Sequence, residues 1–384
     1  MQLVVAKGST PRVHRGRDRL LLLCDYHPGL LDSLSKTLNS VGLNERVLVR
    51  KRGRAEWRDE RTQVINLALR VFGEEEALRI SSIVSLLAYV ILATAMGLLV
   101  VVKRRLDTII GIFAFPQGLV AVLIAALTGR KAIVLTDGGD IDIMLANSSI
   151  RALILAFLRK ASTITALNST KRRKLRSLGI ESQFCPIFGV DTSCFRYVTY
   201  EDKEDRLILY VGRLSNEKRP EVLLEACNRA RREGFSFKLL ILGDGPLRNQ
   251  IADAIVRMGM TDIVTLEGYV PHSQIYQFFQ RGAIFVLPSI REGVSVSLLE
   301  AMSSGCLCIV SDIPDNQEII RHMRNGILFR PDDVEDLADK LRWANSNPSK
   351  VAIITRRARQ TIQQNYSLQA VGETIAALLV TGEH

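Results

Sequence analysis

Two glutamates, Glu292 and Glu300, stand eight residues apart in one stretch of the chain. An apolar run, Ala283–Pro288, precedes the first and predicts a buried strand of a parallel sheet. The second falls in a segment of helix-forming composition, Leu298–Met302, and Gly305 suits the residue just after a helix. Strand, loop and helix in that order place both carboxylates at the edge where open α/β sheets bind ligands.

Backbone N–H groups lie between the two carboxylates, on Gly293, Val294 and Ser295. Such groups at the positive end of a helix bind anions. We expect Glu300 to lie two turns into the helix, roughly 12 Å from Glu292 at about 1.5 Å of rise per residue. Two carboxylates around a ring of donors suit a nucleotide sugar, which has hydroxyls at both ends and phosphates in the middle. In the alternative interpretation, Glu292 only caps the helix and Glu300 is a solvated helix residue.

Similar motifs follow other predicted strands. The strand Leu207–Val211 leads into Gly212 and Arg213, and Lys218 follows shortly after. The remaining motifs are, in order, Gly243-Asp244-Gly245-Pro246 after the strand Lys238–Leu242, Glu267-Gly268-Tyr269-Val270-Pro271, Pro314 and Glu318 after the strand Ile309–Asp312, Asn325-Gly326, and Phe329-Arg330-Pro331.

This order of motifs resembles the C-terminal half of the retaining GT-B glycosyltransferases of family 4, over residues 206–345. The resemblance implies an α/β fold with two Rossmann-like parallel-sheet domains facing an interdomain cleft. It also implies a C-terminal helix that crosses back to the first domain. The expected division is an acceptor-binding, membrane-facing domain over 1–199, a nucleotide-sugar-binding domain over 200–363, and the returning helix over 364–384.

The resemblance also implies which residues bind the donor. Arg213 and Lys218 are expected on its diphosphate, where cations offset the charge that builds as the phosphate leaves. Glu292 matches the glutamate on the sugar hydroxyls, and Glu300 the one on the ribose. The other expected donor-binding residues are Gly212, Gly243 and Gly245, which allow close backbone approach, Tyr269 and Val270 beside the base, and Gly293, Val294 and Ser295. No cofactor or metal is expected.

The N-terminal half matches less closely. A strand at Leu20–Cys24 leads into a loop in which Gly29 is the glycine available to approach the donor phosphates. Asp137 stands where many family members carry a histidine, before the tight turn Gly138-Gly139. It is expected to accept a hydrogen bond from a sugar or acceptor hydroxyl. Asp140-x-Asp142 resembles a metal-binding DxD sequence, but a GT-B site holds its phosphates with basic groups and helix ends.

Positive charge is concentrated in the first half of the chain. The formal net charge is +11, yet residues 1–199 hold 29 Lys and Arg against 16 Asp and Glu, and the remainder is slightly negative. Such asymmetry indicates an anionic partner. Few aromatic residues interleave with the basic clusters, which disfavours nucleic acid and favours an anionic membrane surface. A merely solvated basic surface is the alternative.

An uncharged segment, Ile80–Val102, precedes the basic triplet Lys103-Arg104-Arg105. Its length would span a bilayer. It could instead be a helix packed on the sheet, or such a helix whose outer face also presses into the membrane surface. We favour the last, because an apolar outer face beside basic clusters needs a partner.

The resemblance implies a retaining, metal-independent glycosyltransferase that uses a UDP or GDP sugar, and the basic, apolar first half favours a lipid-linked or membrane-associated acceptor. A cytoplasmic, peripherally membrane-bound enzyme is expected, because the six cysteines form no C-x-x-C pair and the N-terminus has no secretory signal. Two alternatives stay open: a nucleotide-sugar epimerase of the same fold, and a non-catalytic membrane-bound partner subunit.

Overall fold

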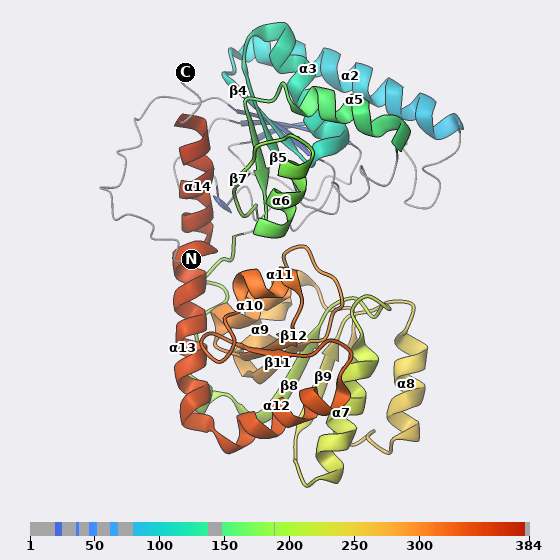
Figure 1. The fold of residues 1–384 in the computed structure, drawn as a ribbon, viewed down its shortest axis with the longest axis vertical. Helices are drawn as coiled ribbons and strands as arrows, with labels where there is room; N and C mark the ends of the chain where they lie inside the picture. Colours follow the sequence, from blue (N-terminus) through green and yellow to red (C-terminus); the bar gives the residue numbers. More distant parts are fainter. Residues whose placement is uncertain are drawn as a thin grey trace.

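The computed structural model consists of two stacked lobes, with a long helical segment running along one side of both (Figure 1). The residues that it describes are 20–24, 36–37, 46–51, 62–67, 80–136, 148–187 and 189–380.

The sheet of the N-terminal lobe is parallel in all its described pairings. Its described strands are, in sequence, β1 (Leu20–Cys24), β2 (Arg46–Lys51), β3 (Thr62–Leu67), β4 (Thr108–Ile112), β5 (Lys131–Leu135), β6 (Thr163–Ala166) and β7 (Gln183–Phe184). They lie in the order β3-β2-β1-β4-β5-β6-β7. The sequence did not predict β3, because the surrounding residues 53–73 are polar and lack a clear apolar alternation.

Helices cover the two faces of this sheet. On one face lie α2 (Ile80–Arg104), α3 (Leu119–Thr128), α5 (Ser148–Leu158) and α6 (Ser169–Ser177). On the other lies α14 (Leu368–Val380), whose Val371 and Ile375 pack against Ile110 and Ile133 of the sheet. Ile109, next to Ile110, faces the opposite layer, as alternation along a strand requires. The C-terminal helix therefore supplies part of the N-terminal core.

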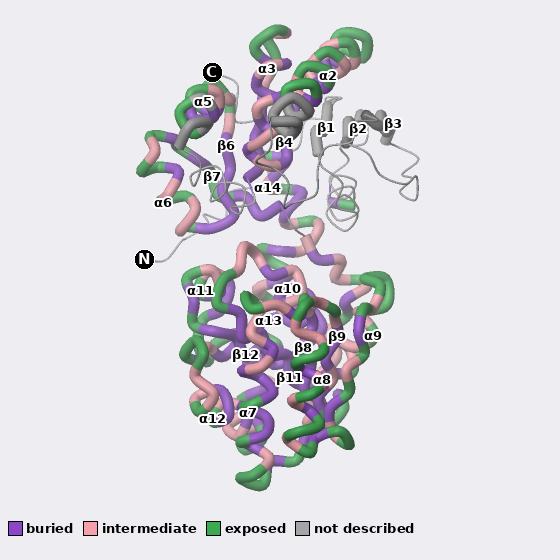
Figure 2. Tube along the Cα trace, turned by 90° about the vertical axis from the view of Figure 1, so that its right-hand side faces the viewer, coloured by how far each residue is buried: buried purple, intermediate pink, exposed green. Residues whose placement is uncertain are grey.

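Helix α2 has a buried stripe and an exposed stripe, both free of charge. Tyr89 and Ala93 are buried against the lobe, and the small residues Ala93 and Gly97 allow the helix to approach closely. Leu87, Ile91, Ala95, Leu99 and Val102 follow one another at helical spacing on the outside, where Ile91 is 69% exposed and Leu99 67%. Figure 2 shows this exposed side of α2 at the end of the upper lobe.

The C-terminal lobe contains a second parallel sheet. Its described strands are β8 (Glu204–Val211), β9 (Lys238–Leu242), β10 (Val264–Gly268), β11 (Gly282–Leu287), β12 (Leu307–Ser311) and β13 (Ile327–Phe329), in the order β10-β9-β8-β11-β12-β13. Its helices are α7 (Pro220–Arg232), α8 (Arg248–Arg257), α9 (His272–Arg281), α10 (Val296–Ser304), α11 (Pro314–Ile319), α12 (Val334–Ser346) and α13 (Pro348–Asn365). Strand β8 begins three residues before the strand that we predicted from Leu207.

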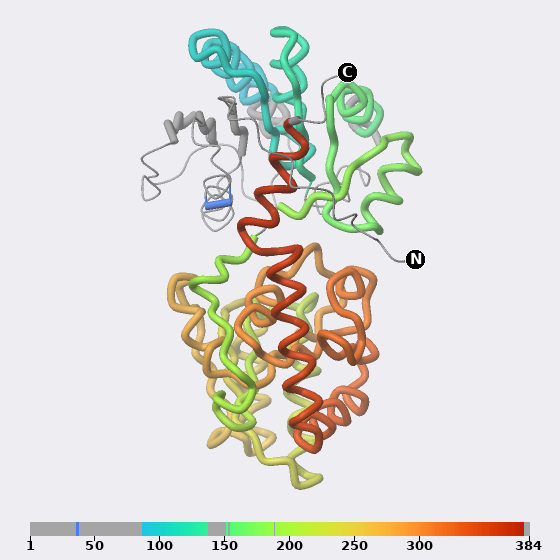
Figure 3. Tube along the Cα trace, turned by 90° about the vertical axis from the view of Figure 1, so that its left-hand side faces the viewer, coloured from blue at the N-terminus to red at the C-terminus, as the bar shows by residue number. Residues whose placement is uncertain are grey.

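Two chain segments cross between the lobes. Helix α13 packs on the lower lobe, and α14 continues from it into the upper lobe (Figure 3). At the crossing, the Val190 amide donates to the carbonyl of Tyr366, and the Leu368 amide donates to the carbonyl of Val190. A Cβ on Gly189 would lie 2.9 Å from the Cα of Leu368, so this close approach requires glycine.

The predicted fold class is confirmed. Both sheets are parallel throughout their described pairings. In each sheet the strand order reverses beside its first strand: next to β1 in the upper lobe, and between β8 and β11 in the lower one. Loops that leave neighbouring strands in opposite directions at such a point create a ligand-binding crevice.

Candidate functional site

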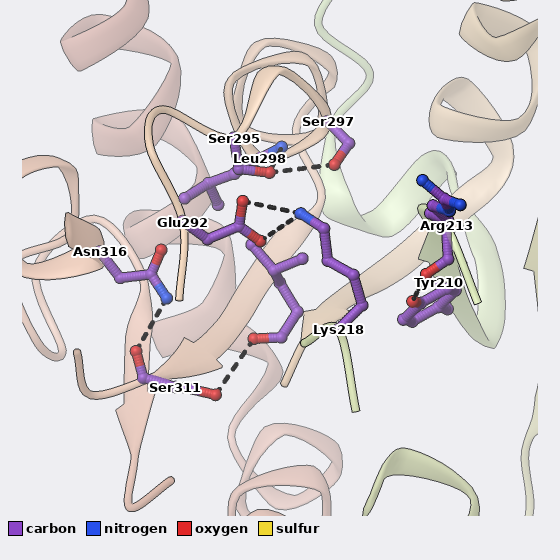
Figure 4. A network of polar contacts seen from close by, with 10 residues as sticks. Tyr210, Arg213, Lys218, Glu292, Ser295, Ser297, Leu298, Ser311 and Asn316 are labelled. Atoms are coloured by element: carbon purple, nitrogen blue, oxygen red, sulfur yellow. Dashed lines mark hydrogen bonds and ion pairs between the residues drawn. The ribbon is translucent and has the colours of Figure 1, made fainter. Parts of the chain in front are cut away.

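A lysine and a glutamate meet where the strand order of the C-terminal sheet reverses. Lys218 lies in the loop after β8, and Glu292 in the loop after β11. The Lys218 Nζ lies 2.6 Å from Oε1 and 2.7 Å from Oε2 of Glu292, so the ammonium holds both carboxylate oxygens. Figure 4 shows the two side chains facing each other across the gap between their loops. The structure thus joins two predicted site residues that are 74 positions apart in the sequence.

This ion pair is largely withdrawn from water. The side chain of Glu292 is 6% exposed and that of Lys218 is 25% exposed. Asp315, on α11, accepts a hydrogen bond from the backbone N–H of Glu292, and burial raises its pKa. Its Oδ1 also accepts from Asn168 Nδ2 of the upper lobe at 2.9 Å. The pair therefore lies beside a polar contact that joins the two lobes.

The predicted anion-binding loop leads into α10. Ser295 is the N-cap residue of this helix, and its hydroxyl accepts a hydrogen bond from the Leu298 amide at 3.4 Å. Val294 packs against the hydrophobic cores of both lobes. Gly305 ends the helix with a φ of 84°, as predicted. The helix begins at Val296, two residues before the predicted start at Leu298. Glu300 is its fifth residue and lies about one turn inside it, so the prediction that Glu300 lies two turns into the helix is wrong.

The second glutamate has a partner that the sequence did not predict. Glu300 is 4% exposed, and its Oε1 lies 2.6 Å from Nε2 of His272, the first residue of α9. Burial raises the pKa of Glu300, and the hydrogen bond from His272 lowers it by less. The only signal in the sequence was that His272 follows the motif ending in Pro271, next to the residues expected beside the base.

The three predicted glycines lie where the loops after β8 and β9 pack closely against each other. Gly243 has a φ of 138°, and a Cβ there would lie 1.9 Å from the carbonyl oxygen of Gly212. Gly245 has a φ of 158°, and its Cβ would lie 2.3 Å from the carbonyl oxygen of Leu214. These two positions require glycine because the two loops press on each other. The contact shapes the loop that carries Arg213.

The remaining predicted residues of the lower lobe lie in the loops after β8 and β10. Arg213 is exposed, and its backbone carbonyl accepts from the Tyr210 hydroxyl at 2.9 Å. Figure 4 shows its guanidinium apart from the Lys218–Glu292 pair. Tyr269 is 76% exposed, and Val270 packs against the core beneath it. Gly29 and Asp137, which we predicted in the upper lobe, lie outside the described residues.

No cluster of three or more His, Cys, Asp or Glu side chains that could hold a metal ion occurs within the described ranges. Among the described residues, the site contains the Lys218–Glu292 ion pair, the buried carboxylate of Glu300, the half-buried carboxylate of Asp315 and backbone amides near the start of α10.

Comparison with known proteins shows which family the C-terminal lobe resembles. Residues 195–361 match the family model described as "Glycosyl transferases group 1". The putative colanic acid biosynthesis glycosyltransferase WcaL of Salmonella typhimurium is 26% identical over 58% of this chain and 57% of its own length. The chain spans about half the length of the curated relatives it matches.

Solved structures match the whole arrangement. Sucrose-phosphate synthase of Thermosynechococcus elongatus superposes with a TM-score of 0.75 at 17% identity, covering 94% of this chain and 98% of its own. HepE of Anabaena, in complex with UDP and glucose, gives a TM-score of 0.73 at 16% identity, covering 94% and 99%. The chain thus has the GT-B fold, and its residues 195–361 are similar to the glycosyltransferase group 1 family.

Proposed function

We propose that this chain is a retaining glycosyltransferase that moves a sugar from a nucleoside-diphosphate sugar to an acceptor hydroxyl without a metal ion. The observation that carries the proposal is the Lys218–Glu292 ion pair, largely buried at the strand-order reversal of a domain similar to the glycosyltransferase group 1 family. The chain is similar to WcaL, which is named a putative glycosyltransferase, and to HepE, whose structure contains UDP and glucose. Both similarities support the donor class.

The pair provides a cation and an acceptor of hydrogen bonds within one small volume. When the donor enters, its sugar hydroxyls donate to the Glu292 carboxylate, and Lys218 turns part of its charge toward the diphosphate. Arg213, which is exposed beside the same loop, and the amides of Gly293 and Ser295 add further donors. A charge that grows on the departing phosphate oxygen is stabilised most by groups already in place.

The reaction breaks the bond between the anomeric carbon and the diphosphate oxygen and forms one from that carbon to the acceptor oxygen. The acceptor proton passes to the departing diphosphate oxygen on the same face of the sugar, which retains the configuration. Glu300, held by His272, binds the ribose hydroxyls at the far end of the donor. Domain closure excludes water, and the Asn168–Asp315 hydrogen bond lies where the lobes meet.

The acceptor in this proposal is lipid-linked, and the enzyme is cytoplasmic and lies on the membrane surface through its upper lobe. Helix α2 contains one 18-residue window, Leu87–Arg104, that is long and apolar enough to cross a membrane. Its stripe through Tyr89 and Ala93 packs on the lobe, so we propose that it lies flat, with its outer face in the interface. Lys103 and Arg104 at its end suit anionic headgroups.

Donor binding can be tested with a thermal-shift screen against nucleoside diphosphates and nucleotide sugars, because a ligand that binds only the folded state raises the melting temperature. We expect nucleotides with one particular base to raise the melting temperature most. Transfer from the corresponding nucleotide sugar to a lipid-linked acceptor should then release the nucleoside diphosphate. Turnover of the nucleotide sugar without acceptor would instead identify an epimerase. No stabilisation by any member of the panel would contradict the proposal and favour a non-catalytic subunit.

A further inference from the structure

A wide groove lies between the lobes, lined by α6 from the upper lobe and by α11, the turn after it and α13 from the lower one. Its volume is about 1020 Å³, and four arginines line it: Arg172 on α6, Arg321 and Arg324 after α11, and Arg357 on α13. Glu318 is the carboxylate in its lining. The groove therefore combines positive charge from both lobes with room for a ligand.

These arginines differ from others in the same lobe. Arg219, Arg229 and Arg342 each form ion pairs with carboxylates. Within the described part of the chain, none of the four groove arginines does so. Arg321 donates one N–H to the carbonyl oxygen of Gln317 at 2.9 Å, and the others are exposed. Like charges left together without counterions repel, so an anion that enters the groove relieves that repulsion.

The acidic residue in the groove is already engaged. Glu318 Oε1 accepts from the Ser169 amide at 3.2 Å, and the Ser169 hydroxyl also contacts it. Its charge is thus directed across the lobe junction toward the start of α6. It offsets only part of the positive charge of four arginines.

One face of α13 supplies neutral donors beside the charges. Arg357, Gln360 and Gln364 line the groove at spacings of three and four residues, which places them side by side along the helix. Both glutamines are exposed. Their amides can donate to ester oxygens or hydroxyls between charged groups.

The groove is separate from the proposed donor site but shares a helix with it. Helix α11 directs Asp315 toward the Glu292 backbone and Asn168, and it places Glu318 in the groove. The α6–α11 contact therefore lies between the two. A ligand that holds Arg172 together with Arg321 would pull the same two helices toward each other.

We propose that this groove is a second anion site, which binds a molecule carrying two or more phosphate groups and thereby favours the closed arrangement of the lobes. Arginine holds phosphate through two parallel hydrogen bonds, and two phosphates are needed to engage arginines from both lobes at once. The proposal concerns binding and does not depend on the catalytic activity.

Isothermal titration calorimetry with inorganic pyrophosphate tests the site. The donor site also binds such an anion, so the titration is made in Lys218→Met, which weakens that site and leaves the groove intact. In this background we expect Arg321→Gln/Arg324→Gln/Arg357→Gln to lower the affinity at least tenfold. The matched control is Arg232→Gln/Arg257→Gln/Arg356→Gln, which removes the same charge from exposed arginines outside the groove. It should lower the affinity less than threefold.

A single substitution in the other lobe keeps the test independent of the triple variant's folding. Arg172→Gln, on α6, should also weaken pyrophosphate binding severalfold, although it lies across the junction from the other three arginines. Equal affinity in the groove variants and the control would overturn the proposal. So would a loss caused by the triple variant but not by Arg172→Gln, because the site would then lie in one lobe.

The phosphates in question can belong to a soluble molecule or to a lipid headgroup. Flotation with vesicles containing cardiolipin, whose headgroup carries two phosphates, distinguishes these sources when the groove variant and the control are compared. A deficit of the groove variant in both assays assigns the site to headgroups, and a deficit with pyrophosphate alone assigns it to a soluble ligand. The absence of a deficit in either assay rejects the site.

Discussion

The two lobes share an architecture but present different surfaces. In the lower lobe, two carboxylates are withdrawn from water and paired: the side chain of Glu292, after β11, is 6% exposed beside Lys218, and that of Glu300, on α10, is 5% exposed beside His272. In the upper lobe, the outer face of α2 is apolar and exposed, and its Ile91 is 69% exposed. Lys103 and Arg104 follow at the end of the same helix. The shared arrangement of sheet and helices therefore does not determine which side chains each lobe buries or exposes. Buried charged groups in the lower lobe are suited to binding a polar donor, and an exposed apolar face in the upper lobe is suited to contact with a membrane surface.

Replacing the lysine of the Lys218–Glu292 pair should affect sugar transfer by the lower lobe and leave membrane binding by the upper lobe unchanged. Lys218→Met removes the cation that we place on the diphosphate, so we expect kcat for transfer to fall by about 10²- to 10³-fold. Leaving Glu292 without its partner should also cost about 1–3 kcal/mol of stability. Steady-state kinetics and denaturant unfolding measure the two effects.

The matched control for this variant is Lys238→Met, an exposed lysine at the opposite end of the neighbouring strand β9. It should keep wild-type kinetics and stability, and both variants should bind vesicles as the wild type does. Equal activity of the two variants would remove Lys218 from the mechanism.

Changing the outer face of α2 should have the opposite effects: membrane binding should weaken and donor binding should stay the same. Ile91→Asp and Leu99→Asp place charges on residues that are 69% and 67% exposed, so the fold tolerates them. Binding to anionic vesicles should weaken about tenfold or more, because a charge replaces apolar area that would enter the interface. Donor binding should not change. Co-sedimentation with vesicles and thermal shift measure the two.

Val256→Asp is the control, since this valine of α8 is also 67% exposed but lies in the lower lobe. It should leave vesicle binding intact. If all three variants bind vesicles equally, α2 does not contact the membrane, and the contrast between the lobes disappears.

The smallest effect concerns the second carboxylate. Because burial raises the pKa of Glu300, the folded protein retains a proton that the unfolded chain releases. The stability linked to that proton is fully present below the ordinary glutamate pKa and is lost as pH rises through the raised value. Glu300→Gln should therefore show a weaker fall in stability from pH 4 to pH 7 than the wild type. If the stability of the wild type and of Glu300→Gln, measured by thermal unfolding, falls equally from pH 4 to pH 7, Glu300 is not responsible for this pH dependence.

Much of the lower lobe was predictable because its signals are local. The apolar runs that became β9, β11 and β12 are each followed by a glycine or a polar motif, so both the strand and its functional end could be recognised. The order of those motifs also matched a known family. What the sequence could not indicate was which motifs touch: the bidentate Lys218–Glu292 contact depends on the strand order, in which β11 returns to lie beside β8.

Other features were hidden for physical reasons. The pairing of His272 with Glu300 joins two elements through side chains alone, and a histidine at a helix start carries no signal for its partner. Strand β3 lies at the sheet edge, and its sequence, Thr-Gln-Val-Ile-Asn-Leu, does not alternate strictly between polar and apolar residues. The exposed face of α2 was also ambiguous in sequence, since an entirely apolar helix has no period to show which side is inside.

The rate of sugar transfer by Glu292→Gln, measured with the donor identified in the thermal-shift screen, shows whether the buried pair acts in catalysis. This variant keeps the shape of the side chain but removes the charge that holds Lys218 and accepts from the sugar hydroxyls. The account predicts that kcat falls by at least about 10²-fold while the variant stays folded and still binds the nucleoside diphosphate. Transfer at the wild-type rate would contradict it.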